Sequence, residues 1–368
     1  MGIIEYFVRL IVDNSTILGY VVAHGTTVLF PRRQDGGVSA VDAERQRPTV
    51  VILGATSEEP PPGLGPIAES TSFRFAADAQ ELEGAIGGAD VLLVWDFRST
   101  ELQDAWHRVD KLRWVHVAGA GVDAVLFPDM VESRVTLTNS RGVFDRSIAE
   151  YVLGLMLVFA KDIHQTLRLQ QQKKWVHRET EMLAGRRLLV VGAGSIGRTI
   201  ARLARCAGME VDAIARTARS SDEDFRRVFA SEDLNDALPS VDYVVVAAPL
   251  TAQTRGMFGA AQFERMNPSA RLINVGRGPI VDEPALIEAL RDGRIAGAVL
   301  DVFSEEPLSE DSPLWEMPQV VVSPHMSGDF VGWLEALGEL FVENFRRWER
   351  GDELLNVVDK ERGYASSG

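Results

Sequence analysis

Short apolar runs alternate with longer amphipathic stretches along the chain from Thr49 onward. The first series comprises TVVILG (49–54), DVLLVW (90–95), RWVHVAG (113–119) and VTLTN (135–139). Short β-branched runs separated by helical stretches predict a mostly parallel sheet covered by helices. The stretch SIAEYVLGLMLVFAKDI (147–163) is apolar all round, which predicts a helix buried between domains rather than one with a single apolar face.

A second alternating series follows this helix. Its apolar runs span residues 187–192, 209–214, 241–248, 270–275, 296–303 and 319–323. A long helical stretch (329–350) and a short predicted strand, LLNVV (354–358), come last. The predicted fold class is therefore α/β, with two Rossmann-like, doubly wound parallel-sheet domains.

The first 48 residues do not share this pattern. Apolar positions at helical spacing between Ile3 and Ile11 predict either a short amphipathic helix or a poorly ordered extension, and residues 31–48 are typical of a linker. Charged residues interrupt the apolar stretch 3–30, so we expect neither a membrane span nor a secretory signal there. No function is assigned to this region.

Composition narrows the classes of partner and compartment. The 368 residues include 38 Lys and Arg against 53 Asp and Glu, a formal net charge of −15, which disfavours nucleic acid and anionic membranes as partners. The only cysteine, Cys206, excludes an intrachain disulfide and fits a reducing, cytoplasmic location. We expect Cys206 to fill the core. The sequence has no CxxC, HExxH or clustered acidic ligand set, so no metal is expected.

A glycine-rich loop stands between a predicted strand and a predicted helix. The segment VVGAGSIG (190–197) places Gly192, Gly194 and Gly197 in the spacing GxGxxG, with a helix opening at Ser195 and Ile196. The first glycine allows a tight turn, the second lets the backbone approach a pyrophosphate, and the third lets helix and strand pack closely. Free amides at the helix N-terminus would then face the phosphates. The context predicts a dinucleotide site.

The end of the next strand bears on which dinucleotide binds. Sites for NAD place an acid about 20 residues after the loop, but Ala215 stands 18 residues after Gly197, and Arg216, Thr217 and Arg219 follow it. A guanidinium can grip a 2′-phosphate that a carboxylate would repel. We therefore expect NADP(H) to be preferred, with NAD(H) left open. The acidic run SSDEDF (220–225) is expected to be a solvated helix start.

Three later segments carry candidate catalytic residues at predicted strand ends. Arg277 lies in NVGRGPIVDEPAL (274–286), Glu306 in LDVFSEEPL (300–308) and His325 in VVVSPHMSGD (320–329). Open α/β sheets bind ligands at the carboxyl ends of their strands. An imidazole titrates nearest neutrality and suits proton transfer, whereas a guanidinium suits carboxylate and keto oxygens. These residues are predicted to face one cleft beside the dinucleotide.

In these segments the chain resembles the D-isomer-specific 2-hydroxyacid dehydrogenase family, and in detail its glyoxylate/hydroxypyruvate reductase branch. The resemblance covers roughly residues 49–360 and rests on VVGAGSIG, AAPLTAQTRGMF (247–258), INVGRGPIVDE, LDVFSEEPL and SPH, in the family's order. Arg277 and Glu306 are 29 residues apart, and Glu306 and His325 are 19 apart. The resemblance implies a substrate domain formed by residues 49–146 and 326–360, with a coenzyme domain (147–325) inserted into it.

The resemblance also implies roles for individual residues. His325 would protonate the alkoxide formed by hydride transfer to a 2-keto acid, Glu306 would orient the imidazole, and Arg277 would polarise the keto oxygen and pair with the carboxylate. The substrate-binding residues would be Arg277, Arg98 in VWDFRST, and Gly119 and Ala120 in AGAGVD (118–123). The cofactor-binding residues would be Gly192, Gly194, Ser195, Ile196, Gly197, Arg216, Thr217, Pro249, Thr254, Val275 and Asp301. The product would be a D-2-hydroxy acid, and the enzyme a homodimer.

The residues alone leave open two hypotheses about function, one an enzyme and the other a binding protein. One is an NADPH-dependent 2-ketoacid reductase. The other is a dinucleotide-sensing, corepressor-like binding protein of the same fold, which would keep the same three residues. Phosphoglycerate dehydrogenase is expected less, since no regulatory domain follows residue 360.

Overall fold

The computed structural model describes residues 21–23, 26–28, 47–220 and 222–365. The described residues fall into two units, one within residues 1–46 and one within residues 47–368. In the first unit, β1 (Val21–Ala23) pairs antiparallel with β2 (Thr26–Val28). The helix expected over residues 3–11 and residues 31–46 of the expected linker lie outside the described residues. Among the helices that are described, none has the length and apolarity needed to cross a membrane.

The first α/β sheet is parallel and has five strands in the order β4-β3-β5-β6-β7. Residues 50–53 of β3 and every residue of β5 and β6 are buried, because helices cover both faces of a parallel sheet. One face packs on α1 (Ala79–Ala85), α2 (Glu101–Ala105) and α3 (Pro128–Glu132). The strands are β3 (Thr49–Leu53), β4 (Ser72–Ala76), β5 (Val91–Val94), β6 (Trp114–Val117) and β7 (Thr136–Asn139).

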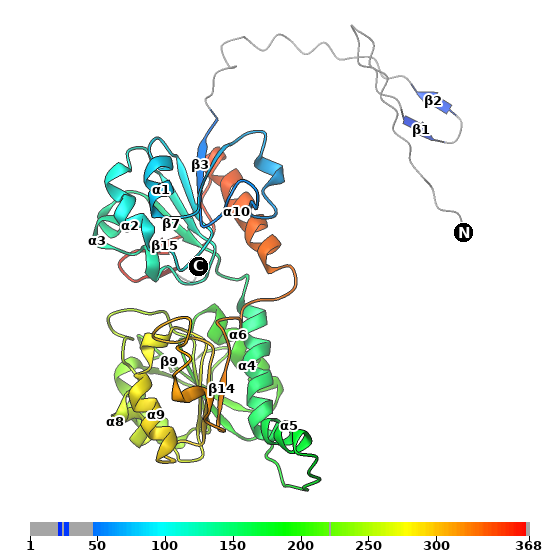
Figure 1. The fold of residues 1–368 in the computed structure, drawn as a ribbon, viewed down its shortest axis with the longest axis vertical. Helices are drawn as coiled ribbons and strands as arrows, with labels where there is room; N and C mark the ends of the chain where they lie inside the picture. Colours follow the sequence, from blue (N-terminus) through cyan, green and yellow to red (C-terminus); the bar gives the residue numbers. More distant parts are fainter. Residues whose placement is uncertain (1–20, 24–25, 29–46, 221, 366–368) are drawn as a thin grey trace. The chain divides into compact units, whose positions relative to one another are not determined.

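The other face of this sheet is covered by α10 (Trp333–Arg350), which comes from the far end of the chain (Figure 1). Trp114 of β6 stacks on Phe341 of α10 with ring centroids 5.2 Å apart. The long helix predicted over 329–350 is thus present but begins four residues later, at Trp333.

The second sheet is also parallel, with seven strands in the order β10-β9-β8-β11-β12-β13-β14. Successive residues of β8 point to opposite faces: Leu188 packs in one core cluster with residues of α4 and α6, and Leu189 in another with residues of α8 and α9. The strands are β8 (Arg187–Val191), β9 (Glu210–Ala215), β10 (Val228–Ala230), β11 (Tyr243–Val246), β12 (Arg271–Asn274), β13 (Gly297–Leu300) and β14 (Val320–Val322).

The helices around this sheet complete a Rossmann-like architecture, so the predicted fold class is confirmed (Figure 1). They are α4 (Asp145–Ala160), α5 (Ile163–Gln171), α6 (Ser195–Cys206), α7 (Leu234–Ala237), α8 (Ala260–Arg265) and α9 (Glu283–Arg291).

In the two parallel sheets, two strands were not predicted, and the strand predicted over 354–358 is wrong. Strands β4 and β10 lie at sheet edges, where fewer positions are buried and the apolar run is short or broken by polar residues. The predicted strand 354–358 is replaced by a two-residue strand, β15 (Val358–Asp359), paired with β16 (Tyr364–Ala365). The side chain of Asn344 binds both the amide and the carbonyl of Leu355, which removes those groups from strand pairing.

Two burial predictions also differ from the structure. Cys206 is exposed, because it ends α6 on the side away from the buried positions Gly197, Ile200, Ala201 and Ala204. The stretch 147–163 forms α4 and the start of α5, and it is not buried all round: Leu157 of α4 is 41% exposed in the single chain.

Candidate active site

The predicted phosphate-binding loop joins β8 to the N-terminus of α6. Gly192 has φ +110°, and a Cβ built there would lie 2.6 Å from the carbonyl oxygen of Ala247. A Cβ on Gly197 would lie 1.9 Å from the carbonyl oxygen of Gly192. Gly194 differs, because a Cβ built on it would have no atom within 4 Å. Gly194 is the N-cap residue of α6 and has no side chain that could accept a hydrogen bond from the helix amides. The N-terminus of α6 is thus uncapped by a side chain, with open space beside Gly194, which fits a dinucleotide pyrophosphate.

The other predicted cofactor residues border the same edge of the sheet. Ser195 donates through Oγ to Asp145 of α4 at 3.3 Å, and Ile196 packs against the core beneath the loop. The hydroxyl of Thr254 donates to the carbonyl of Pro249 at 2.7 Å, which closes the loop after β11. Val275 is buried directly after β12. These contacts fix the loops that would surround a dinucleotide.

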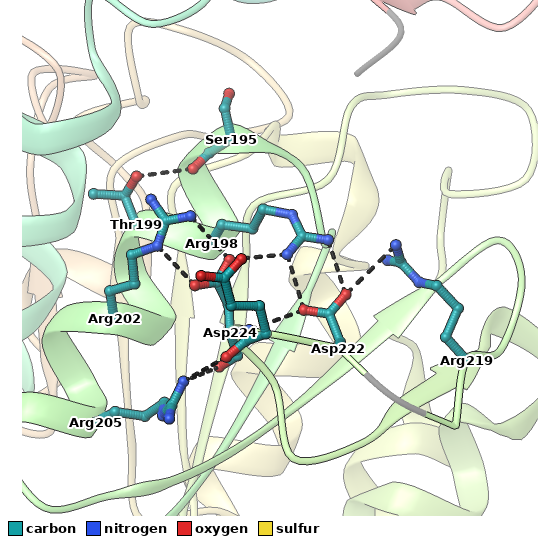
Figure 2. A network of polar contacts seen from close by, with 9 residues as sticks. Ser195, Arg198, Thr199, Arg202, Arg205, Arg219, Asp222 and Asp224 are labelled. Carbon is teal, nitrogen blue, oxygen red and sulfur yellow. Dashed lines mark hydrogen bonds and ion pairs between the residues drawn. The ribbon is translucent and has the colours of Figure 1, made fainter. Parts of the chain in front are cut away.

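Beyond the end of β9, Arg219, Asp222 and Asp224 form a network of ion pairs and hydrogen bonds with arginines of α6 (Figure 2). Arg216 and Thr217 are exposed just after the strand. Arg219 lies 3.5 Å from Asp222, which accepts two hydrogen bonds from Arg198 of α6 at 2.8 and 2.9 Å. Arg198 thereby lowers the pKa of Asp222 to about 2. Two guanidiniums, those of Arg198 and Arg219, thus offset the charge of this carboxylate.

The expectation that residues 220–225 start a solvated helix is wrong. Their described residues form no helix, and the side chains of Asp222 and Asp224 are only 5% and 4% exposed. Asp224 accepts from Arg198 and from Arg202, also on α6. The outer face of α6 supplies the arginines that make burial of these carboxylates tolerable.

The three candidate catalytic residues follow neighbouring strands: Arg277 comes after β12, Glu306 after β13 and His325 after β14. Nδ1 of His325 lies 2.8 Å from Oε2 of Glu306, and Oε1 of Glu306 accepts from the amide of Phe303 at 3.0 Å. Burial raises the pKa of the Glu306 carboxyl, but the hydrogen bonds from His325 and Phe303 outweigh it and lower that pKa overall. An ionised Glu306 orients the imidazole through its contact with Nδ1.

The backbone at His325 is in the left-handed region, with φ +54°, and Asp301 holds it there. The amide of His325 donates to the Asp301 carbonyl at 2.8 Å. The Asp301 carboxylate is fully buried and accepts from the hydroxyl of Ser323 and the amides of Met326 and Ser327. Asp301, predicted to contact the cofactor, is thus placed under the loop that carries His325.

The predicted substrate loop faces Arg277 from the five-stranded sheet. Within the described chain, the amides of Gly119 and Ala120 donate to no other residue, so they are available to a carboxylate. The guanidinium of Arg277 packs on this loop: a Cβ built on Gly121 would lie 1.8 Å from its Nη2. Its Nε donates to Asp123 Oδ1 at 3.1 Å.

Phe97, rather than Arg98, contacts the candidate acid. Its ring meets the ring of His325 edge-on, with centroids 5.3 Å apart, and a Cβ on Gly119 would lie 2.8 Å from its Cβ. Arg98 is 64% exposed and paired with Asp96 at 3.2 Å. Sequence reasoning missed Phe97 and Asp123, although each lies within a segment that it singled out. Only their position next to Arg98 and Gly119 could have drawn attention to them.

Comparison with known proteins agrees with this site. Residues 153–327 match the family model described as D-isomer specific 2-hydroxyacid dehydrogenase, NAD binding domain. The chain is 37% identical to glyoxylate/hydroxypyruvate reductase B of Salmonella newport, over 72% of this chain and 80% of that one. It is 31% identical to D-3-phosphoglycerate dehydrogenase of Methanocaldococcus jannaschii over 76% of its own length, but it spans only 53% of that relative.

A solved structure extends the likeness to the fold. A D-isomer specific 2-hydroxyacid dehydrogenase from Xanthobacter autotrophicus Py2, in complex with NADPH and MES, superposes with a TM-score of 0.75 at 33% identity. The match covers 86% of this chain and all of that one. The chain belongs to the D-isomer-specific 2-hydroxyacid dehydrogenase family. It is therefore an oxidoreductase that uses a nicotinamide dinucleotide, as the sequence predicted.

Proposed function

We propose that this protein reduces small 2-keto acids of the glyoxylate or hydroxypyruvate type to D-2-hydroxy acids, with NADPH as the preferred reductant. The observation that carries the proposal is that Arg277 packs on the loop that bears the free amides of Gly119 and Ala120. Phe97, which packs on Gly119, also contacts His325 of the His325–Glu306 pair. The name of the Salmonella relative supports the substrate class, and the NADPH in the Xanthobacter structure supports the cofactor.

The residues divide the chemistry between them. A bound reduced nicotinamide would supply the hydride that reaches the keto carbon. Arg277 and the amides of Gly119 and Ala120 bind the substrate carboxylate, and the guanidinium also polarises the keto oxygen. His325 donates its proton to that oxygen as the alkoxide forms, and Glu306 orients the imidazole for this transfer through its contact with Nδ1.

The deciding assay follows absorbance at 340 nm while NADPH or NADH reduces a panel of 2-keto acids. Turnover of glyoxylate and hydroxypyruvate in preference to 2-keto acids with bulky side chains supports the proposal. Binding of NADPH without turnover of any keto acid would instead favour the hypothesis of a dinucleotide-sensing binding protein.

The preference for NADPH is expected to depend on Arg216. Its exposed guanidinium follows β9 where a 2′-phosphate would lie. Hydrogen bonds to charged groups contribute about 1.5–3 kcal/mol, so Arg216→Ala should lower kcat/KM for NADPH by roughly 10- to 100-fold. The value for NADH should change little, and Arg265→Ala, which removes an exposed arginine of α8, is the matched control. Equal kcat/KM for the two cofactors in the unmodified enzyme would refute the preference.

We also propose that the enzyme is a cytoplasmic homodimer. A set of large apolar side chains is exposed along α4, α5 and the segment that follows: Leu157, Ile163, Leu167, Trp175, Val176 and Met182. Trp175 is 100% exposed in the single chain. Large apolar side chains exposed along one segment of the chain are typical of an interaction site. The single cysteine fits a reducing compartment.

Charge placed in this apolar set should separate the subunits. Trp175→Glu combined with Leu167→Glu is expected to convert a dimer to a monomer in sedimentation equilibrium, because association would bury two carboxylates without partners. Trp315→Glu is the control, since Trp315 is also exposed but lies near β14. A monomeric unmodified protein at micromolar concentration would contradict the proposal.

A further inference from the structure

Arg277 makes a contact that its proposed role does not by itself require. Its Nε donates to Oδ1 of Asp123 at 3.1 Å. Asp123 begins the 3-10 turn Asp123–Val125 after β6 of the five-stranded sheet, whereas Arg277 follows β12 of the seven-stranded sheet. The ion pair therefore joins elements of the two sheets beside the substrate loop.

The ion pair with Asp123 leaves N–H donors of the guanidinium available to a substrate. Arginine has five N–H donors in a planar fork. Asp123 occupies the Nε donor and the carbonyl of Gly276 accepts from Nη1 at 2.9 Å. The remaining donors lie on the side that includes Nη2, which packs against Gly121 next to the free amides of the loop. Asp123 thus directs the fork without competing with a substrate carboxylate for both of its terminal nitrogens.

Close contacts fix the backbone at Arg277, but they do not determine the rotamer of its long side chain. A Cβ on Gly276 would lie 2.9 Å from the carbonyl oxygen of Ala248, and one on Gly278 would lie 1.8 Å from the carbonyl carbon of Phe303. These close contacts fix the main chain on both sides of Arg277. A free arginine side chain still has several rotamers, and ordering it costs entropy that the bond to Asp123 offsets before substrate arrives.

We propose that Asp123 is a positioning residue of the reductase, which acts through Arg277 to aim the guanidinium at the keto oxygen and carboxylate of the substrate. This inference rests on the proposed function. It assigns to Asp123 an effect on turnover rather than on folding, because an ion pair whose members are 35% and 21% exposed contributes little to stability.

The test starts with Asp123→Ala and steady-state kinetics with glyoxylate and NADPH. A misdirected catalytic group can lower the rate by about 100-fold, so kcat should fall roughly 10- to 100-fold. KM for glyoxylate should change less than about threefold, because losing the neighbouring anion leaves the guanidinium more attractive to a carboxylate. Asp123→Asn, which keeps an acceptor oxygen, should recover most of kcat. Asp129→Ala, an exposed aspartate of α3, is the control and should match the unmodified enzyme.

A double-mutant cycle with Arg277→Gln tests whether Asp123 acts through the arginine. The double variant should be no slower than Arg277→Gln alone. Additive losses would show that Asp123 acts independently and would overturn the proposal, as would an unchanged kcat in Asp123→Ala. If the alanine variant does not fold, Asp123→Ser, whose hydroxyl is one bond shorter than the carboxylate, takes its place in the cycle. Failure of the proposed function would appear differently, as no keto-acid turnover by the unmodified enzyme.

Discussion

Replacing His325 by alanine should lower kcat for keto-acid reduction by roughly 10²- to 10⁴-fold, the usual contribution of a general acid. The imidazole is paired at Nδ1 with Glu306 at 2.8 Å, which leaves Nε2 as the nitrogen that can donate to substrate. Without it, the developing alkoxide has to take its proton from water. Affinity for NADPH, followed by fluorescence titration, should stay close to that of the unmodified protein, because the phosphate-binding loop lies at another strand end.

The control for this substitution is His107→Ala, which removes an exposed imidazole paired with Glu83 in the other sheet's helices. It should leave kcat unchanged. Turnover like that of the unmodified enzyme in the His325 variant would remove the proposed mechanism, whatever the variant's affinity for cofactor.

Replacing Arg277 by alanine should damage both KM and kcat. The guanidinium is proposed to serve the substrate carboxylate in the ground state and the keto oxygen in the transition state, so both parameters depend on it. Loss of two charge-assisted hydrogen bonds, each contributing about 1.5–3 kcal/mol, corresponds to a fall in kcat/KM of roughly 10²- to 10⁴-fold. Saturation kinetics with glyoxylate measure the two parameters separately.

Two further variants sharpen this second prediction. Arg277→Lys keeps the charge without the planar fork. Compared with Arg277→Ala, it should therefore have a lower KM but a kcat that is little improved. Arg294→Ala, an exposed arginine paired with Glu264 and Asp292, should behave like the unmodified enzyme. A lysine variant with full kcat would show that a point charge suffices and that the fork geometry is irrelevant.

Much of the fold could be predicted because burial on both faces of a parallel sheet produces continuous apolar runs. The central strands β3, β5, β6, β8 and β11 were all found this way. Edge strands β4 and β10 are less buried or too short to produce such runs. Cys206 is exposed because it lies at the end of α6 on the face opposite the buried residues. The general preference of cysteine for burial does not take the helix face into account.

The sequence by itself determined the phosphate-binding loop, the central strands of both sheets and the three residues of the proposed chemistry, because each depends on a local run or spacing along the chain. Only the tertiary structure decided which neighbours those residues meet. The contacts of Phe97 with His325 and of Asp123 with Arg277 join residues separated by more than 150 positions. The buried Asp222 and Asp224 likewise take their partners from α6. Such pairings arise from how the sheets and helices pack, and no periodicity along the chain encodes them.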